Sequence, residues 1–294
     1  MKINYLKHHE IDKSKWDACI NDAVFPMVYA YSWYLDTVTN FKWDALVVGD
    51  YDLIFPLPFR CSILGYKQIS HPIFAQQLGL FSKKEISETV LSQFLNQIPP
   101  RFKKVILKLN EKNEISAHPK YEIQKRINIL LDLEFPYEIL RKNYSKNLKR
   151  SLKKAAQNNL VFSEEISIQT AYNFYFEYRG NQLNFSKKVK KRLYNLFTVL
   201  EKKGYAEIVG VYKDQKLLAT VFFIHFKNRI IYLIPPSSPE GKQNFAMHFL
   251  LDQMVQKYAG QKIILDFEGS NVASIARFYH SFGGKNQIYV QILR

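Results

Sequence analysis

Two carboxylates and a tyrosine near the end of the chain could carry out acid–base chemistry. Asp266 and Glu268 end an apolar stretch, and Tyr279 lies in the segment 271–284, NVASIARFYHSFGG. Alternate residues of a strand point to the same side, so we expect both carboxylates on one face of a sheet. A carboxylate there could remove a proton from an amine, and a tyrosine could give one to a leaving group. We prefer Glu268 as the base, because Gly269 leaves room beside it.

Each of these residues also has an ordinary structural interpretation. Either carboxylate could pair with a Lys or Arg side chain, or cap the following helix at Asn271. Tyr279 could be a half-buried aromatic side chain on that helix. The residues alone leave both interpretations open.

A loop at 237–244, SSPEGKQN, could bind an anionic cofactor. Exposed amides at a helix N-terminus bind anions, and glycine lets the backbone approach closely. The loop has a single glycine and an acidic residue, Glu240, and Ser-Pro is also simply a good helix start. The candidate cofactor-binding residues are Ser237, Ser238, Gly241, Lys242 and Asn244.

The segment 141–154, RKNYSKNLKRSLKK, contains seven basic residues and no acidic ones. On a helix the basic residues share one face and the apolar residues the other, which is typical of a solvated surface helix. The same face could track phosphate groups, with Lys142, Lys146 and Arg150 as substrate-binding candidates.

Three further residues are substrate-binding candidates. Gln76 and Gln77 are paired amides in an apolar surrounding, and could bind a polar ligand or pack within their own loop. Arg179 follows an aromatic helix and could clamp a carboxylate or phosphate, although a plain surface arginine is the simpler interpretation.

The overall charge points to acidic partners. The formal net charge is +16, from 42 Lys and Arg against 26 Asp and Glu. Such a field favours nucleic acid such as tRNA, nucleotide-linked substrates or anionic lipid surfaces, although a generic basic surface would give the same charge. Membrane association through the basic segment is the weaker hypothesis, because its apolar face is modest and expected to be buried.

Several classes of protein are disfavoured. The start of the chain lacks an apolar signal region, and no apolar run approaches the ~18 residues of a membrane span. The two cysteines make no disulfide framework, and the seven histidines lack metal-ligand spacing. We therefore predict a cytoplasmic protein without a metal site or a tightly bound cofactor.

Apolar periodicity and turn signals predict the elements that position these residues. In the second half they indicate strands at 160–164, 205–211, 217–226, 230–234, 262–267 and 287–293, and helices at 170–179, 187–203, 238–258 and 272–282. The first half has a similar but weaker order, with strands at 3–6, 45–48, 52–59, 66–70, 103–109 and 122–133, and helices at 14–21, 31–39 and 84–96. No residue-level repeat relates the two halves.

The second half resembles the GNAT-type N-acyltransferases. Three features carry the resemblance: the order of the elements, Pro235-Pro236 at the end of the third strand of a meander, and the strand–Gly–helix unit at 265–284. Two such halves with a basic helix between them resemble the FemAB branch. The resemblance implies an α+β fold of two tandem GNAT-like domains, a degenerate 1–135 and 136–294, each a mixed, mainly antiparallel sheet flanked by helices.

The resemblance also implies an activity, the transfer of an acyl or aminoacyl group to a small-molecule or peptide amine bound between the two halves. The donor would be an acyl-coenzyme A, or alternatively an aminoacyl-tRNA. GNAT enzymes often have a tyrosine at the position of Tyr279 that protonates the departing thiolate. FemAB-type proteins instead have a Phe-Lys pair, where this chain has Phe278-Tyr279. The difference favours a thioester donor.

A second hypothesis is a catalytically silent scaffold that binds nucleic acid or an anionic cell-wall precursor. The missing lysine, the unusual loop at 237–244 and the net charge of +16 all permit this interpretation. Salt dependence distinguishes the two hypotheses, since pure phosphate binding weakens steeply with salt.

Overall fold

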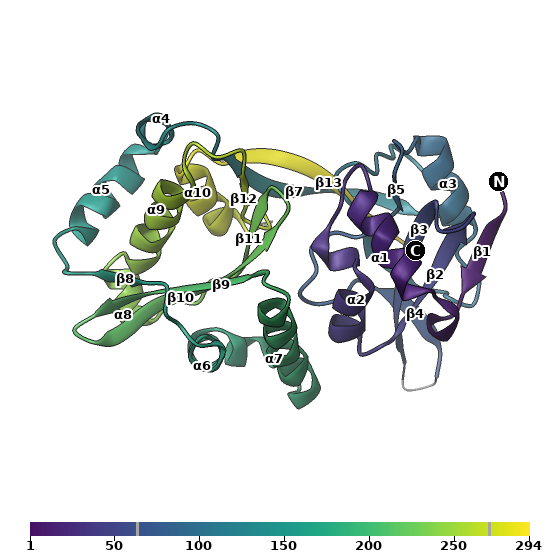
Figure 1. Cartoon of the computed structure of the whole chain (residues 1–294), viewed down its shortest axis with the longest axis horizontal. Helices are drawn as coiled ribbons and strands as arrows, with labels where there is room; N and C mark the ends of the chain where they lie inside the picture. Colours follow the sequence, from purple (N-terminus) through teal and green to yellow (C-terminus); the bar gives the residue numbers. More distant parts are fainter. Residues whose placement is uncertain (63–64, 270–271) are drawn as a thin grey trace. The chain divides into compact units, whose positions relative to one another are not determined.

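A computed structural model describes residues 1–62, 65–269 and 272–294 (Figure 1). These residues form two compact units, Met1–Arg126 with Ile288–Arg294, and Ile127–Gln287. The strands β7 (Glu122–Asp132) and β13 (Lys285–Leu293) each contribute residues to both units. The sequence placed the junction at 135–136, which lies inside the second of these units.

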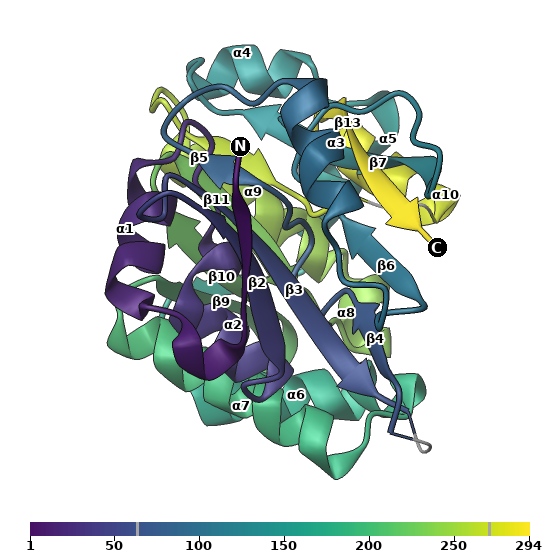
Figure 2. The ribbon, with the colours of Figure 1, turned by 90° about the vertical axis from the view of Figure 1, so that its right-hand side faces the viewer.

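The first unit is built on one sheet. Its strands lie in the order β1 (Ile3–Leu6), β2 (Trp43–Val48), β3 (Leu53–Cys61), β4 (Lys67–Ser70), β6 (Val105–Lys108) and β13. β4 and β6 pair in parallel, and the other neighbours in this order pair antiparallel. The short β5 (Phe81–Ser82) pairs with β3. The unit also contains the helices α1 (Lys13–Asp22), α2 (Ser32–Thr39) and α3 (Glu88–Asn96) (Figure 2). α1 and α2 contact β3, and the ring of Phe94 on α3 lies 6.2 Å from that of Phe55 on β3.

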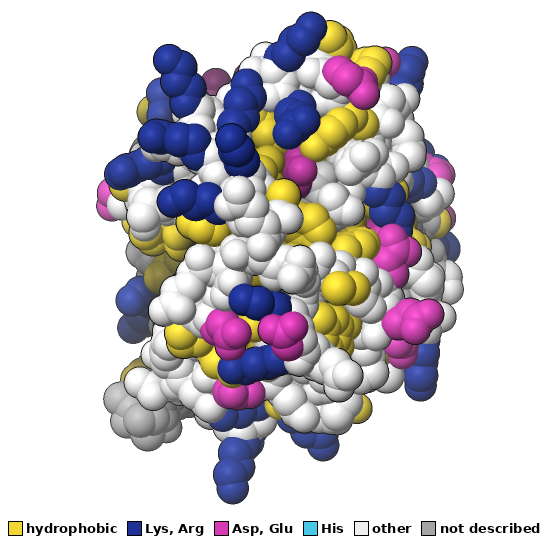
Figure 3. All heavy atoms as spheres, turned by 90° about the vertical axis from the view of Figure 1, so that its left-hand side faces the viewer, with side chains coloured by type: hydrophobic (Ala, Val, Ile, Leu, Met, Phe, Trp, Pro, Cys, Tyr) yellow, Lys and Arg dark blue, Asp and Glu magenta, His cyan; other side chains and the backbone are white. Residues whose placement is uncertain are grey.

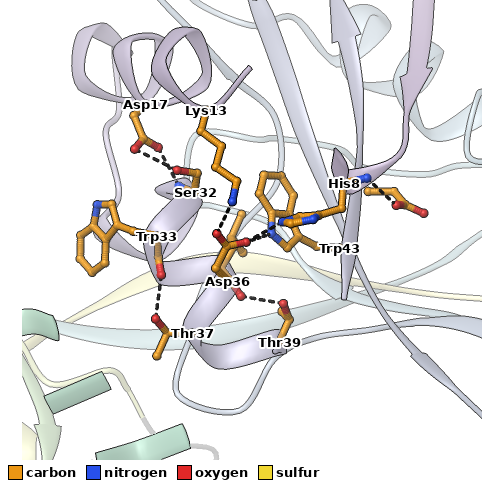
Figure 4. A network of polar contacts seen from close by, with 11 residues as sticks. His8, Lys13, Asp17, Ser32, Trp33, Asp36, Thr37, Thr39 and Trp43 are labelled. Carbon is orange, nitrogen blue, oxygen red and sulfur yellow. Dashed lines mark hydrogen bonds and ion pairs between the residues drawn. The ribbon is translucent and has the colours of Figure 1, made fainter. Parts of the chain in front are cut away.

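A buried carboxylate joins the N-terminal elements of this unit. Asp36 of α2 accepts hydrogen bonds from Trp43 Nε1 at 2.8 Å and Lys13 Nζ at 2.6 Å, and pairs with His8 Nε2 at 2.7 Å (Figure 4). These partners lie on β2, on α1 and on the short 3-10 helix His8–Glu10. Because both carboxylate oxygens have partners, the burial of the charge is compensated.

The predicted elements of the first half are confirmed, apart from their ends. The helix expected from Lys84 begins instead at Glu88, where Ser87 Oγ accepts a hydrogen bond from Val90 N at 3.3 Å. Sequence reasoning missed β5, because a strand of two residues has no periodicity to detect.

The second unit has a sheet in the order β7, β12 (Ile264–Asp266), β11 (Arg229–Ile234), β10 (Lys216–Phe226), β9 (Ala206–Lys213) and β8 (Val161–Ser163). β11 and β12 pair in parallel, and the remaining neighbours pair antiparallel. The prediction of mixed, mainly antiparallel sheets flanked by helices is therefore confirmed.

Helices cover both faces of this second sheet (Figure 1). They are α4 (Tyr137–Lys142), α5 (Lys146–Ala155), α6 (Ile168–Tyr178), α7 (Lys187–Lys202), α8 (Pro239–Gln243), α9 (Ala246–Tyr258) and α10 (Ala273–Ser281). Val209 and Val211 belong to the core formed with α9, and α5 packs on α9 in turn. On the other face Phe222 stacks on Phe197 of α7, with ring centroids 3.9 Å apart.

Two helices that the sequence predicts as continuous are broken. The helix expected over 238–258 is divided into α8 and α9 at Phe245, whose φ is +59°. The basic segment is divided into α4 and α5 around Tyr144, and Ser145 Oγ caps α5 by accepting from Leu148 N at 3.1 Å. Tyr144 and Leu148 are both buried, so the apolar pattern continues through the break and conceals it.

A half-buried histidine in the first unit makes stability depend on pH. His71 Nδ1 accepts from Lys108 N at 3.2 Å, and its Nε2 donates to Ala75 O at 3.0 Å. Burial lowers the pKa of His71 to about 3. The unfolded chain, with an ordinary histidine pKa near ~6.5, therefore binds the proton first as pH falls. The stability that His71 contributes is fully present above about pH 6.5, and it is lost as the pH falls toward 3.

We expect this histidine to steepen the acid side of the stability profile by up to about 1.4 kcal/mol per pH unit. His71→Gln should flatten the decline in the free energy of unfolding between about pH 6 and pH 4, measured by urea unfolding. His9→Gln, which changes an exposed histidine, should not. Equal slopes for the wild type and His71→Gln would contradict the assignment.

Candidate active site

The candidate site lies where β11 and β12 separate. Their pairing ends where Ile231 lies opposite Asp266. Beyond this pair β11 runs on toward Pro235, whereas Phe267 N donates to Ile129 O at 3.0 Å and so stays beside β7. The sheet therefore opens at the place that the proline pair indicates.

A pocket of about 530 Å³ lies at this opening. Its walls come from α6, from the end of β11 with the loop that follows, and from α8, α9 and α10. Most of the lining surface is apolar, and among the described lining residues Arg179 and Lys242 carry a positive charge. The pocket therefore suits a ligand with an apolar part and an anionic part.

Tyr279 of α10 forms part of the pocket wall. Its side chain is 7% exposed, its ring stacks on Phe267 at 4.6 Å, and it meets Tyr232 edge-on at 5.8 Å. Burial, and secondarily the carboxylate of Glu268, raises the pKa of Tyr279. The phenol therefore stays protonated at physiological pH, so it can donate a proton but cannot act as a base.

The structure corrects the expectation for the two carboxylates. Asp266 is completely buried; its Oδ2 accepts from Arg229 Nη1 at 2.7 Å and its Oδ1 from Glu268 N at 2.8 Å. β12 ends at Asp266, and Glu268 has a φ of +55°, so strand alternation does not extend to Glu268. Asp266 thus forms an ion pair with an arginine, which is one of the structural interpretations that the sequence allowed. Glu268 is half-buried and acts electrostatically on Tyr279.

The strand predicted at 262–267 is shorter in the structure, where β12 covers Ile264–Asp266. The structure describes the strand–Gly–helix unit at 265–284 except for Ser270 and Asn271. The suggested cap at Asn271 lies outside the described residues. The predicted helix is present as α10.

The predicted cofactor loop divides into two groups of residues. Ser237, Gly241 and Lys242 line the pocket. Ser238 is buried and caps α8, because its Oγ accepts from Gly241 N at 2.9 Å. Asn244 accepts from Lys213 Nζ at 3.2 Å and is not among the described lining residues. The helix-start interpretation is confirmed for Ser238.

Glycine is required at Gly241 for close packing. A Cβ there would lie 2.2 Å from Leu218 O of β10, so α8 lies directly against the strand. The negative charge of Glu240 is offset by Lys216, whose Nζ lies 2.6 Å from the carboxylate.

The other predicted binding residues lie in three places. Arg179 is at the end of α6 and lines the pocket. Lys142, Lys146 and Arg150 are exposed and are not among the described lining residues. They lie in the basic region over α4 and α5, where Lys and Arg side chains gather (Figure 3).

Gln76 and Gln77 belong to the first unit and are buried there. Gln77 Nε2 donates to Gln76 Oε1 at 2.7 Å, and Gln77 Oε1 accepts from Glu111 N at 2.9 Å. These bonds favour the alternative in which the two glutamines pack within their own loop, because both ends of the Gln77 amide are hydrogen-bonded to the protein.

His248 and Tyr232 are among the pocket residues that sequence reasoning did not single out. His248 lines the pocket, with its ring 4.9 Å from that of Phe278. Burial lowers the pKa of His248, so the imidazole is neutral at pH 7 and can accept a proton. Its position at the start of α9, directly after the candidate loop, was the available signal.

In the part of the chain that the structure describes, no group of three or more His, Cys, Asp or Glu side chains is arranged to hold a metal. Within the same residues, no helix combines the length and apolar character needed to cross a membrane.

No protein-family model and no curated protein matches this sequence. Solved structures do match. FemX superposes with a TM-score of 0.67 at 12% identity, over 99% of this chain and 97% of that chain. A conserved protein of unknown function from Bacteroides thetaiotaomicron gives 0.58 at 10% identity, over 100% of both chains. L-PGS from Bacillus licheniformis gives 0.57 at 12% identity, over 96% of this chain and 92% of that chain.

The chain has a FemAB-like tandem GNAT-type fold. Because the matches extend over nearly the whole of each chain, the likeness is not confined to one half. At identities of 10–12% these matches show the fold alone. The chemistry of this chain therefore has to be argued from its own residues.

Gly269 is expected to be more sensitive to substitution than an equivalent glycine in an open turn. Gly269 has a φ of +55°, and a Cβ there would lie 2.2 Å from Ile127 O of β7. Gly260 has a φ of +80° with nothing within 4 Å. Gly260→Ala should lower the free energy of unfolding by about 1 kcal/mol, and Gly269→Ala by roughly 2–4 kcal/mol.

Urea unfolding followed by circular dichroism measures both losses. Equal losses for the two variants would mean that the backbone at Gly269 is not held against β7.

Proposed function

We propose that this protein is an N-acyltransferase that moves an acyl or aminoacyl group from an activated donor to an amine. The observation that carries the proposal is the pair Tyr279 and Glu268 beside a pocket where β11 and β12 separate. In the GNAT-type fold the opening at this place admits the donor, which supports assigning the pocket to the donor.

The side chains suit the proton transfers of acyl transfer. The nitrogen lone pair of a neutral amine forms the new C–N bond, and the bond from the carbonyl carbon to the leaving group breaks. The amine must lose a proton, and Glu268 is the proposed acceptor, with the neutral imidazole of His248 as a second group able to accept one. The departing sulfur or oxygen must gain a proton, and the protonated phenol of Tyr279 can supply it.

The charge of the pocket suggests how the donor is held. Arg179 and Lys242 are the proposed contacts for phosphate groups of an acyl-coenzyme A or of the end of an aminoacyl-tRNA. We favour the thioester, because a tyrosine stands at 279, where GNAT enzymes often have one that protonates the departing thiolate.

Removal of the Tyr279 hydroxyl should slow the reaction and leave the fold intact. Tyr279→Phe keeps the ring that stacks on Phe267, so we expect unchanged thermal unfolding. With a donor and amine that the wild type uses, kcat should fall by about 10²–10³-fold. Tyr194→Phe on α7, which changes a tyrosine outside the described pocket lining, is the matched control. Equal turnover by Tyr279→Phe and wild type would remove Tyr279 from the mechanism.

Calorimetric titration with coenzyme A and acetyl-coenzyme A tests the thioester assignment. At ~200 mM salt, non-specific phosphate binding is suppressed, so we expect saturable one-to-one binding. Arg179→Ala with Lys242→Ala should weaken it by about tenfold or more. If no heat of binding is observed, the thioester assignment is wrong and charged tRNA is the next titrant.

The exposed cations of α5 support a second candidate function, a scaffold that binds nucleic acid or an anionic cell-wall precursor without group transfer. Binding of this kind should weaken by orders of magnitude between ~50 and ~200 mM salt, whereas binding in the pocket should persist.

A further inference from the structure

One face of the second unit combines exposed apolar side chains with a cluster of cations. It consists of Phe135, α4 and the outer side of α5, and we refer to it as the α4–α5 face. We propose that the α4–α5 face docks the protein on an anionic lipid bilayer.

The apolar part of this face is held outward by the packing of α4. Leu140 is 3% exposed in the core, and Tyr137 OH donates to Asp252 Oδ1 of α9 at 2.9 Å. With these two side chains turned inward, Phe135 and Ile139 remain 52% and 42% exposed. Phe135 lies two residues before α4 and Ile139 lies on it, and exposed apolar side chains of this kind can enter a bilayer interface.

A cationic hollow lies between α4 and α5. Its volume is about 420 Å³, and it is lined by Tyr137, Glu138, Arg141, Lys142 and Lys149. Lys149 Nζ donates to Lys142 O at 2.9 Å, which ties α5 to the end of α4. Three cations and one carboxylate give the hollow a net positive charge, which suits the phosphate of a lipid headgroup.

The charge continues along α5. Lys146, Arg150, Lys153 and Lys154 are exposed on its outer side. Within the described residues, no carboxylate forms an ion pair with any of the seven cations of the 141–154 segment. Figure 3 shows Lys and Arg side chains gathered in its upper part, with hydrophobic side chains between them. Clustered cations next to a membrane surface are attracted by its negative potential.

A bilayer fits these observations better than a nucleic acid does. Cations alone are enough to track a duplex phosphate backbone, and the exposed aliphatic side chain of Ile139 would add nothing to such binding. A bilayer interface takes up both features, since apolar side chains enter it and cations stay at the headgroups. The apolar side of α5 cannot insert into a bilayer, because Leu148 and Leu152 are 2% and 8% exposed and are packed in the core.

Co-sedimentation with vesicles tests the proposal. We expect the full chain to bind phosphatidylcholine vesicles that contain phosphatidylglycerol, and to bind pure phosphatidylcholine vesicles much less. Lys142→Gln with Lys149→Gln should lower the partition coefficient roughly 25-fold, since each cation near the surface contributes about fivefold. Phe135→Ser with Ile139→Ser should lower it about tenfold or more.

Matched variants elsewhere on the second unit control for general effects. Val161→Ser changes an apolar residue of β8 that is 60% exposed, and Lys187→Gln with Lys188→Gln removes two exposed cations from α7. Neither should change vesicle binding by more than about twofold. Equal thermal unfolding of all variants shows that the fold is kept.

A second measurement locates the contact. Trp fluorescence of Phe135→Trp should shift to the blue, and should be quenched by brominated lipid, only with the anionic vesicles. Two results would overturn the proposal. One is vesicle binding without quenching at position 135. The other is loss of binding in the cation variant alone, together with equally strong competition by RNA, which would identify the face as a nucleic-acid site.

Discussion

The buried carboxylate of Asp266 fixes the geometry on which the candidate site depends. An isolated carboxylate in the interior costs several kcal/mol, so it must have partners. Arg229 at the start of β11 supplies one and the N–H of Glu268 the other. The first contact ties the paired part of β11 to β12. The second stabilises Glu268 in a left-handed conformation that side chains other than glycine rarely adopt.

Burial then acts on the side chains of the pocket in opposite directions. It raises the pKa values of Tyr279 and Tyr232, which keeps two phenols protonated, and lowers the pKa of His248, which keeps an imidazole unprotonated. The same apolar surrounding thus provides proton donors and a proton acceptor without a charged residue among these three. The charged residues in or beside the pocket that we consider are Arg179, Lys242 and Glu268.

The sequence predicted the order of the elements and singled out some of the residues that line the pocket, because both depend on local signals. Apolar alternation shows β9 and β10, and two prolines stop β11 where the sheet opens. The left-handed backbone at Glu268 and Phe245 was not predictable, since it depends on tertiary contacts and neither residue type favours it. His248 was missed for a related reason. A histidine on an apolar helix is usually a core residue, and only the opening of β11 and β12 turns its surroundings into a pocket.

The division of β13 between the two units has a consequence for the order of folding during synthesis. The second unit is formed by the continuous segment 127–287, so all of its residues are synthesised one after another. The first unit is begun earlier, but its sheet lacks one of the two strands that pair with β6 until residues 288–294 have emerged. An unpaired strand edge is a template for wrong pairing, and here it stays open while the whole second unit is being translated. The half that is made first is therefore the half that is finished last.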